Sequence, residues 1–366
     1  MNNDNVYLYT KIKQQLIEYI KDLPINSRIP TRTELVKKFG VTRTTIERAI
    51  SELIGEGYFY SRIGSGTYLI KKEKGSSLNK KSSWGIIMPN ITTDTYPEII
   101  RAVEDVCSEA GINLIICNSD NNIEKQEKYI TQLVESGVTG IVMVPVIEKP
   151  LENKSFDILI EKDVKFVFCN RGVDGINAPR VVSNDFYGGN IATRHLFING
   201  WIRPAYISRP FYSISERRYN GYLNAVYDYG TLLNENYVRF ESDFDIENSG
   251  YEVMKQLLEL PEPPDSVFCF NDAVAVGAYR AIEEKGKKVG RDIGVIGYDD
   301  THICESLRPK LTSVRYPKYE IGRRAADILL RMTRNEVLKE NFCSMVFQPE
   351  LIIRESCGED RKPQNN

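Results

Sequence analysis

A run of polar residues divides this chain into two parts that must fold separately. Residues 71–83 read KKEKGSSLNKKSS and contain almost no apolar side chain. Such a stretch cannot bury enough apolar surface to offset the entropy of ordering its backbone. We therefore expect a first domain at residues 1–71, a linker at 72–83, and a second, larger part formed by most of the 366 residues.

The two parts also carry opposite net charge. The first 83 residues hold 15 Lys and Arg against 8 Asp and Glu, whereas the rest hold 33 against 42. Attraction to phosphate acts within about one Debye length, so a basic head on an acidic body suits a nucleic-acid contact confined to one end. A chance distribution of surface charge is the alternative.

The first part contains the pattern of two consecutive helices. Thr31 and Glu34 form a capping box for a short helix that should end at Gly40. A second helix should begin after Thr42 and bury one face, because its apolar residues recur at helical spacing. These residues are Ile46, Ala49, Ile50, Leu53 and Ile54.

A hairpin comes after the two helices. Residues 58–60 and 67–70 read as short strands, and the glycine-rich residues 64–66 read as the turn between them. A further amphipathic helix at 9–21 should pack beneath the second helix of the pair. Helix pairs alone are common in proteins, so the added hairpin, or wing, is the feature that favours DNA binding.

This order of elements, with VTRTTIERAI as its clearest signature, resembles the winged helix-turn-helix of the GntR regulators over residues 6–71. The resemblance implies that the second helix meets bases and phosphates and that the wing tip lies near the minor groove. Thr33 and Glu47 stand where the family often has arginine, so neighbouring Arg32 and Arg48 would have to substitute. The DNA-binding residues implied are Arg32, Thr33, Arg43, Thr44, Thr45, Arg48, Ser65 and Gly66.

From Trp84 onward, short apolar runs alternate with amphipathic helical segments. The runs GIIM, NLIIC, GIVMV and KFVFC predict the strands of a parallel, doubly wound α/β sheet, and a second series begins with VVSND near Val181. Ligands bind such sheets at the carboxyl ends of the strands, where this chain is polar. The polar groups suit a ligand rich in hydroxyls, although salt bridges between lobes are an equal alternative. They include Asn170, Arg171, Asn271, Asp272, Asp299 and Asp300.

Three segments make residues 84–356 resemble the effector domain of the LacI/GalR regulators, which is related to periplasmic sugar-binding proteins. They read FNDAVAVGAYRAIEEKG, VGRDIGVIGYDD and LRPKLTSVRYPKYEIGRRAADILL. A GntR-type head on this body, with the ending FQPELIIRES, is similar to the arabinose repressor group. The resemblance implies a chain that crosses three times between two lobes. They would comprise residues 84–171 with 316–342 and residues 172–315 with 343–356, followed by a tail at 357–366.

The same resemblance implies an effector site. Arg218 opens the family's R-x-x-G-[FYW] pattern, and Phe244 matches an aromatic that packs on a pyranose face, with a core phenylalanine as the alternative. Asn170 and Tyr316 differ from the Asp and Gln that relatives often have there, so L-arabinose is implied only by the group. The expected ligand-binding residues are Thr95, Tyr96, Asn170, Arg218, Phe244, Asn271, Asp299, His302 and Tyr316.

The function implied is a dimeric, cytoplasmic repressor of carbohydrate-utilisation genes that leaves its operator when a monosaccharide binds between the lobes. A carbohydrate-binding transport component is the alternative, but the amino terminus lacks an export signal and no apolar run approaches about eighteen residues. An enzyme is a third reading, yet the chain has no nucleophile elbow, P-loop or dinucleotide fingerprint.

Metal and cofactor sites are not expected. The chain has two histidines, and neither lies near another metal ligand in the sequence. Its seven cysteines show no C-x-x-C pairing, and several lie within apolar runs, so we expect reduced thiols in the core.

Overall fold

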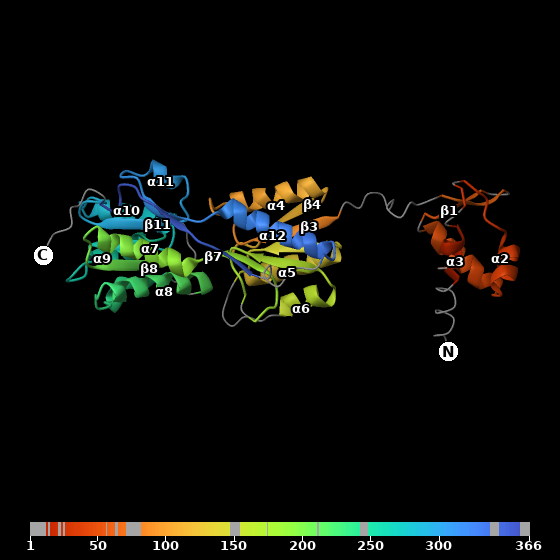
Figure 1. The fold of residues 1–366 in the computed structure, drawn as a ribbon, viewed down its shortest axis with the longest axis horizontal. Helices are drawn as coiled ribbons and strands as arrows, with labels where there is room; N and C mark the ends of the chain where they lie inside the picture. The colour runs from red at the N-terminus through yellow and green to blue at the C-terminus, as the bar shows by residue number, and fades with distance from the viewer. Residues whose placement is uncertain are drawn as a thin grey trace. The chain divides into compact units, whose positions relative to one another are not determined.

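The structure is a computed structural model, and it divides into two compact units, residues 1–80 and 81–366, which we call the head and the body (Figure 1). The linker expected at 72–83 lies outside the described residues up to residue 81, and Ser83 already begins a strand. The described residues are 12–13, 15–20, 23–24, 26–55, 57–62, 65–70, 82–146, 154–173, 175–210, 212–241, 248–336 and 344–358.

The head contains the helix pair that the capping pattern predicts. Thr31 caps α2 (Arg32–Phe39) in a complete capping box, in which its backbone N–H donates to Glu34 Oε2 at 2.7 Å. Gly40 ends the helix with φ at 68°, a left-handed conformation that glycine adopts at little cost. The next helix, α3 (Arg43–Gly55), begins after Thr42, as expected.

The wing and the core of the head come next. Strands β1 (Phe59–Arg62) and β2 (Gly66–Leu69) pair antiparallel. Residues 15–20 are helical, and their inner face packs with the inner faces of α2 and α3. This apolar core leaves the opposite face of α3 in solvent. Its fully buried members include Leu16, Leu35, Ile46, Ala49, Leu53 and Phe59.

The first lobe of the body is a six-stranded sheet in which every pairing is parallel, with the strand order β13-β7-β6-β5-β3-β4. Helices α4 (Pro97–Ala110) and α12 (Lys318–Thr333) cover one face, and α5 (Ile123–Glu135) and α6 (Lys154–Glu161) cover the other (Figure 1). The strands are β3 (Ser83–Met88), β4 (Asn113–Asn118), β5 (Gly140–Met143), β6 (Lys165–Cys169), β7 (Arg180–Ser183) and β13 (Ser344–Phe347).

The second lobe repeats this plan with the order β14-β12-β11-β10-β8-β9, in which β14 alone is antiparallel to its neighbour. Helices α7 (Asp185–Ile198) and α8 (Ser213–Asp228) pack on one face, and α9 (Tyr251–Leu258) and α10 (Asp272–Glu284) on the other. The strands are β8 (Pro204–Ser208), β9 (Val238–Phe240), β10 (Ser266–Cys269), β11 (Gly294–Tyr298), β12 (Thr312–Arg315) and β14 (Glu350–Ile352); the short helices are η1 (Glu235–Tyr237) and α11 (Ile303–Ser306).

Two glycines allow α7 and α8 to touch backbone to backbone. A Cβ at Gly189 would lie 2.3 Å from the carbonyl oxygen of Arg218, and one at Gly221 would lie 2.1 Å from that of Phe186. Any larger residue would push the helices apart. This close packing brings Asp185 within reach of Arg218 across the helix pair.

The lobe boundaries differ from the sequence-based expectation. Residues 180–183 and 344–347 were expected in the second lobe, but both strands belong to the first sheet, where β13 pairs with β7. An apolar run such as VVS has the same appearance whichever sheet it joins, so the sequence could not assign it. The chain crosses between the sheets near residues 184, 316 and 348, which is the expected number of crossings.

The body also extends further than expected at its carboxyl end. Cys357, predicted to begin a tail, is fully buried, and its carbonyl oxygen accepts a hydrogen bond from Trp201 Nε1 at 2.8 Å. Residues 359–366 lie outside the described part of the chain. Among the helices that are described, none is both long and apolar enough to cross a membrane.

Candidate functional site

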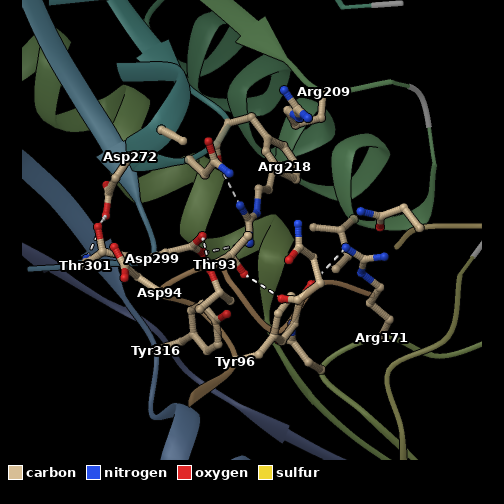
Figure 2. A pocket seen from close by; sticks show the side chains of 18 of the residues that line it. Thr93, Asp94, Tyr96, Arg171, Arg209, Arg218, Asp272, Asp299, Thr301 and Tyr316 are labelled. Carbon is tan, nitrogen blue, oxygen red and sulfur yellow. Dashed lines mark hydrogen bonds and ion pairs between the residues drawn. The ribbon is translucent and has the colours of Figure 1, made fainter. Parts of the chain in front are cut away.

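A cavity of about 460 Å³ lies between the two lobes, at the carboxyl ends of their strands. Its wall combines amides, hydroxyls, charged groups and aromatic rings (Figure 2). The structure therefore brings together residues that are far apart in the sequence. Those of the expected ligand-binding residues that line the cavity are Thr95, Tyr96, Asn170, Arg218, Asn271, Asp299 and Tyr316.

Two of the expected ligand-binding residues are not among the described residues that line the cavity. Phe244 lies outside the described residues. The side chain of His302 is 75% exposed, and its Nδ1 lies 3.3 Å from Asp94 Oδ2. Asp94 does line the cavity, so His302 lies beside the wall rather than in it.

Arg218 holds the charges at the centre of the cavity together. Its Nε donates to Asp185 Oδ1 at 2.9 Å, and its Nη2 lies 3.8 Å from Asp299 Oδ1. The guanidinium also lies 3.4 Å from the ring centroid of Tyr298, and its Nη1 donates to the carbonyl oxygen of Phe270 at 2.6 Å. Burial raises the pKa of both carboxyls, and the arginine's charge opposes that rise. Two nitrogens of this arginine are thus committed to hydrogen bonds within the protein.

Asp299 also ties the lobes to each other. Its Oδ2 accepts from Thr95 Oγ1 of the first lobe at 3.1 Å, and its carbonyl oxygen accepts from Lys318 Nζ. The backbone of Asp299 has φ at 99°, a conformation that non-glycine residues rarely adopt. The hydrogen bonds from Thr95 and Lys318 therefore join the two lobes on this side of the cavity.

Asp272 is fixed by the protein around it. Its Oδ2 accepts from the backbone N–H and the hydroxyl of Thr301 at 2.7 and 3.0 Å, and its Oδ1 accepts from Ser313 Oγ at 2.6 Å. Burial, reinforced by the charge of Asp299, raises the pKa of Asp272 to about 7. Next to it, Asn271 lines the cavity, and its Oδ1 caps α10 by accepting from the backbone N–H of Val274 at 3.0 Å.

On the opposite side, Arg171 and aromatic rings form the wall (Figure 2). Arg171 Nη2 donates to the hydroxyl of Tyr96 at 3.1 Å, and Nη1 donates to the carbonyl oxygen of Pro145 at 3.5 Å. The guanidinium carbon lies 5.0 Å from the ring centroid of Tyr212 in the second lobe. Burial raises the pKa of Tyr96 to about 12, so this hydroxyl stays neutral.

Sequence reasoning missed several residues of this wall. Arg209 directly follows β8, so the rule of inspecting strand ends would have found it. Its Nη1 donates to Glu241 Oε2 at 2.9 Å. Tyr212 and Phe270 carry no signal of their own, because buried aromatics are ordinary core residues. Asp185 does not line the cavity itself; it opens α7 just after β7, and it was not considered as the partner of Arg218.

In the head, two of the expected DNA-binding arginines are exposed on α3. The side chain of Arg43 is 73% exposed and that of Arg48 is 61% exposed. Each is near a carboxylate one turn further on: Arg43 Nε lies 2.9 Å from Glu47 Oε1, and Arg48 Nε lies 3.9 Å from Glu52 Oε1. Thr33 and Thr44 are also exposed.

The family resemblance implied that Thr45 contacts DNA, but its side chain is not exposed. Its side chain is buried, and its hydroxyl is 2.9 Å from that of Thr42. The reason is helical phase, because Thr45 stands one turn before Ala49 on the buried side of α3. Arg32 is half-buried and donates to Thr67 Oγ1 at 2.7 Å, which ties α2 to the wing.

The wing tip is partly described. Ser65 Oγ lies 2.6 Å from the hydroxyl of Tyr68. Gly66 has φ at 127°, and a Cβ there would lie 2.6 Å from Arg28 Nε. Only glycine fits this position without displacing the arginine.

Metal-ligating and thiol groups in the described part of the chain do not form a second site. That part contains no group of three or more His, Cys, Asp or Glu residues that could hold a metal ion. The six cysteines within it are buried and form no disulfide with one another, and burial raises the pKa of Cys107 to about 12. Cys343 lies outside the described residues.

Comparison with known proteins gives matches to both parts. Residues 8–69 match the bacterial regulatory proteins of the gntR family, and residues 193–357 match the periplasmic binding protein-like domain. The HTH-type transcriptional repressor PurR of Glaesserella parasuis is 32% identical over 337 residues, which cover 89% of this chain and 98% of that protein.

Two further proteins resemble the chain. The arabinose metabolism transcriptional repressor of Geobacillus stearothermophilus is 25% identical over 358 residues, 96% of this chain and 98% of that protein. A LacI family transcriptional regulator from Enterococcus faecium, solved with bound ribose, is 26% identical with a TM-score of 0.64. That similarity covers 75% of this chain and 98% of the solved one.

Proposed function

Because this chain belongs to the LacI-type transcriptional repressors and carries a GntR-type head, we propose that it represses carbohydrate-utilisation genes until a monosaccharide binds in the body. Family membership makes it a DNA-binding regulator that responds to a small molecule, in place of a transport component. The observation that carries the finer proposal is the polar cavity between the lobes, in a chain whose head exposes a recognition helix.

A sugar is the effector class that the cavity supports best. Its volume falls in the range of small-molecule sites, and it joins hydrogen-bonding groups to aromatic faces. We assign hydroxyl recognition to Asn170, Asn271 and Asp299, and apolar contact to Tyr96 and Tyr316. The ribose bound to the Enterococcus regulator supports this class. The Geobacillus relative supports L-arabinose as a first candidate.

The head would contact the operator through the exposed side of α3 and the wing. Arg43, Thr44 and Arg48 project from α3 and would enter or flank the major groove. Ser65 and Gly66 would approach the minor groove. One such head offers few contacts, so we propose a homodimer that binds a two-fold operator.

Regulation then requires two arrangements of the lobes. The chain crosses between them three times, so one lobe can rotate against the other as a rigid body about these crossings. A sugar can shift this equilibrium only if it binds one arrangement better. Moving it from 1:99 to 99:1 takes about 5.5 kcal/mol of differential affinity.

The test is operator binding by the full chain, with an operator selected from a random-sequence DNA pool. Pentoses and hexoses, each as the neutral sugar and as charged derivatives, are titrated into the complex while fluorescence anisotropy is recorded. We expect at least one to release the DNA, and Asn271→Ala to abolish the release without weakening DNA binding. If no sugar in the panel changes operator affinity, sugar-released repression is contradicted.

A further inference from the structure

One cation of the cavity wall, Arg171, has no carboxylate partner among the described residues. Arg171 is only 8% exposed, and within the described residues no carboxylate lies in salt-bridge distance of it. Its Nε is buried and makes no hydrogen bond in that part of the chain. Its contacts are a tyrosine hydroxyl, a backbone carbonyl and the ring of Tyr212.

The other two arginines of the wall have carboxylate partners. Arg218 is paired with Asp185 and lies near Asp299, and Arg209 is paired with Glu241. The remaining carboxyls are also engaged. Asp94 lies 3.3 Å from the imidazole of His302, and Asp272 accepts three hydrogen bonds.

A buried guanidinium without a counter-ion is costly. Arginine cannot lose its proton in a protein, so it cannot escape the desolvation penalty by becoming neutral. The face of Tyr212 and two neutral acceptors offset only part of that penalty. The planar fork of an arginine matches the oxygens of a phosphate or a carboxylate, and such charge-assisted bonds are the strong ones.

We propose that the effector of this body is an anionic sugar, whose phosphate or carboxylate pairs with Arg171 while its hydroxyls reach Asn271 and Asp299. This inference rests on the proposed function, since it concerns the same cavity. Figure 2 shows Arg171 on one side of the cavity and Asp272 with Thr301 on the other, so a sugar placed between them would present two chemically different ends. Arg171 comes from the first lobe and Tyr212 from the second, so the bound anion would also contact both lobes.

Calorimetric titration of the full chain with matched sugars tests the inference. The pairs are ribose and ribose 5-phosphate, arabinose and arabinose 5-phosphate, and glucose with glucose 6-phosphate and glucuronate. We expect at least one charged sugar to bind about ten- to a hundredfold more tightly than its neutral partner. Preference for phosphate esters over glucuronate, or the reverse, identifies the anion.

Variants assign the preference to Arg171. Arg171→Met should lose it, Arg171→Lys should keep part of it, and the exposed control Arg203→Met should keep all of it. Urea unfolding of the body, followed by tryptophan fluorescence, reports that each variant is folded.

Each result decides the inference. Equal affinity for neutral and charged sugars, or a preference that survives Arg171→Met, overturns the anionic effector and leaves sugar-released repression standing. If the unaltered chain, with its body shown to be folded, binds no sugar of either kind, both proposals are contradicted.

Discussion

The head and the body both place arginine beside carboxylate, and burial gives the two arrangements opposite uses. Arg43 and Glu47 are 2.9 Å apart with side chains 73% and 48% exposed. Arg218 and Asp185 are also 2.9 Å apart, but with side chains 5% and 4% exposed. The distance between the charged groups is the same in both pairs, but their exposure to water differs.

In water the pair on α3 is worth a few tenths of a kcal/mol and is screened by salt. Arg43 can therefore exchange Glu47 for a DNA phosphate or base at little cost. In the body, each ion has lost its water, so the pair of Arg218 and Asp185 cannot be opened without leaving a bare charge. Exposure keeps Arg43 available for binding, whereas burial beside a carboxylate makes Arg218 part of the folded framework.

The largest expected effect tests this contrast directly. Arg218→Met should destabilise the body by about 3–5 kcal/mol, because it leaves Asp185 and Asp299 buried without their cation. The same substitution at Arg43 should change the stability of the head by less than about 0.5 kcal/mol. Urea unfolding of the full chain measures both. Similar losses in the two variants would remove the distinction between head and body.

A second effect concerns pH. Burial raises the pKa of Asp272 to about 7, above its value of about 3.9 in the unfolded chain, so the folded state holds an extra proton between these values. Stability should therefore fall as pH rises from about 4 to 7, by up to about 1.4 kcal/mol per pH unit. Asp272→Asn should flatten that slope, and the exposed control Asp163→Asn should not. Urea unfolding at several pH values tests this prediction. If the slope of stability against pH is unchanged in Asp272→Asn, Asp272 is not the group that causes it.

DNA affinity gives the third effect. Arg43→Ala should weaken operator binding by about 1–3 kcal/mol and relax specificity at one base pair, because it removes a base contact. Sugar affinity should stay the same, since the cavity lies wholly in the body. Anisotropy titrations with single-base operator variants measure this. A uniform loss over all operator variants would make Arg43 a phosphate contact instead.

Neighbouring threonines on α3 provide a matched pair with a smaller effect. Thr44 is exposed, so Thr44→Ala should lower operator affinity by about 1 kcal/mol and leave stability unchanged. Thr45 is buried against Thr42, so Thr45→Ala should lower the stability of the head by a similar amount. Comparing melting temperature with DNA affinity separates the two roles. A direct DNA contact by Thr45 would reverse the pattern.

The smallest expected effect is at Arg48. Its carboxylate neighbour is 3.9 Å away, so Arg48→Ala should change stability by less than about 0.5 kcal/mol. Loss of one phosphate contact should instead reduce the slope of log affinity against log salt by about 0.9. Binding measured at four or five salt concentrations tests this, with Arg203→Met as the control. A slope equal to that of the unaltered chain would exclude the contact.

Local features of the head were predictable from the sequence because their causes are local. The capping box at Thr31 and the left-handed Gly40 are set by residues within one turn of the helix. The burial of Thr45 could also have been predicted, since this residue stands four positions before the buried Ala49. The family resemblance assigned Thr45 to DNA, and the helical phase of the same ten residues places it inside.

The cavity was predictable in outline, because parallel strands deliver their carboxyl ends to one edge of each sheet. Asn170, Asn271 and Asp299 were found by that rule. The partner of Arg218 was not, because it depends on how closely two helices pack. Asp185 lies 33 positions earlier in the chain and reaches Arg218 only across the glycine contacts of α7 and α8.

The last strands, β13 and β14, each complete a different sheet, and this sets an order of events during synthesis. The head ends its last strand at Leu69, while β14 ends at Ile352, roughly 280 residues or about 14 to 56 s later at ribosomal speed. A chain stopped by a nonsense codon before Ser344 would retain the operator-binding head with neither receptor sheet complete. We expect such fragments to bind operator half-sites as single heads, more weakly than the full chain and with no response to the inducer.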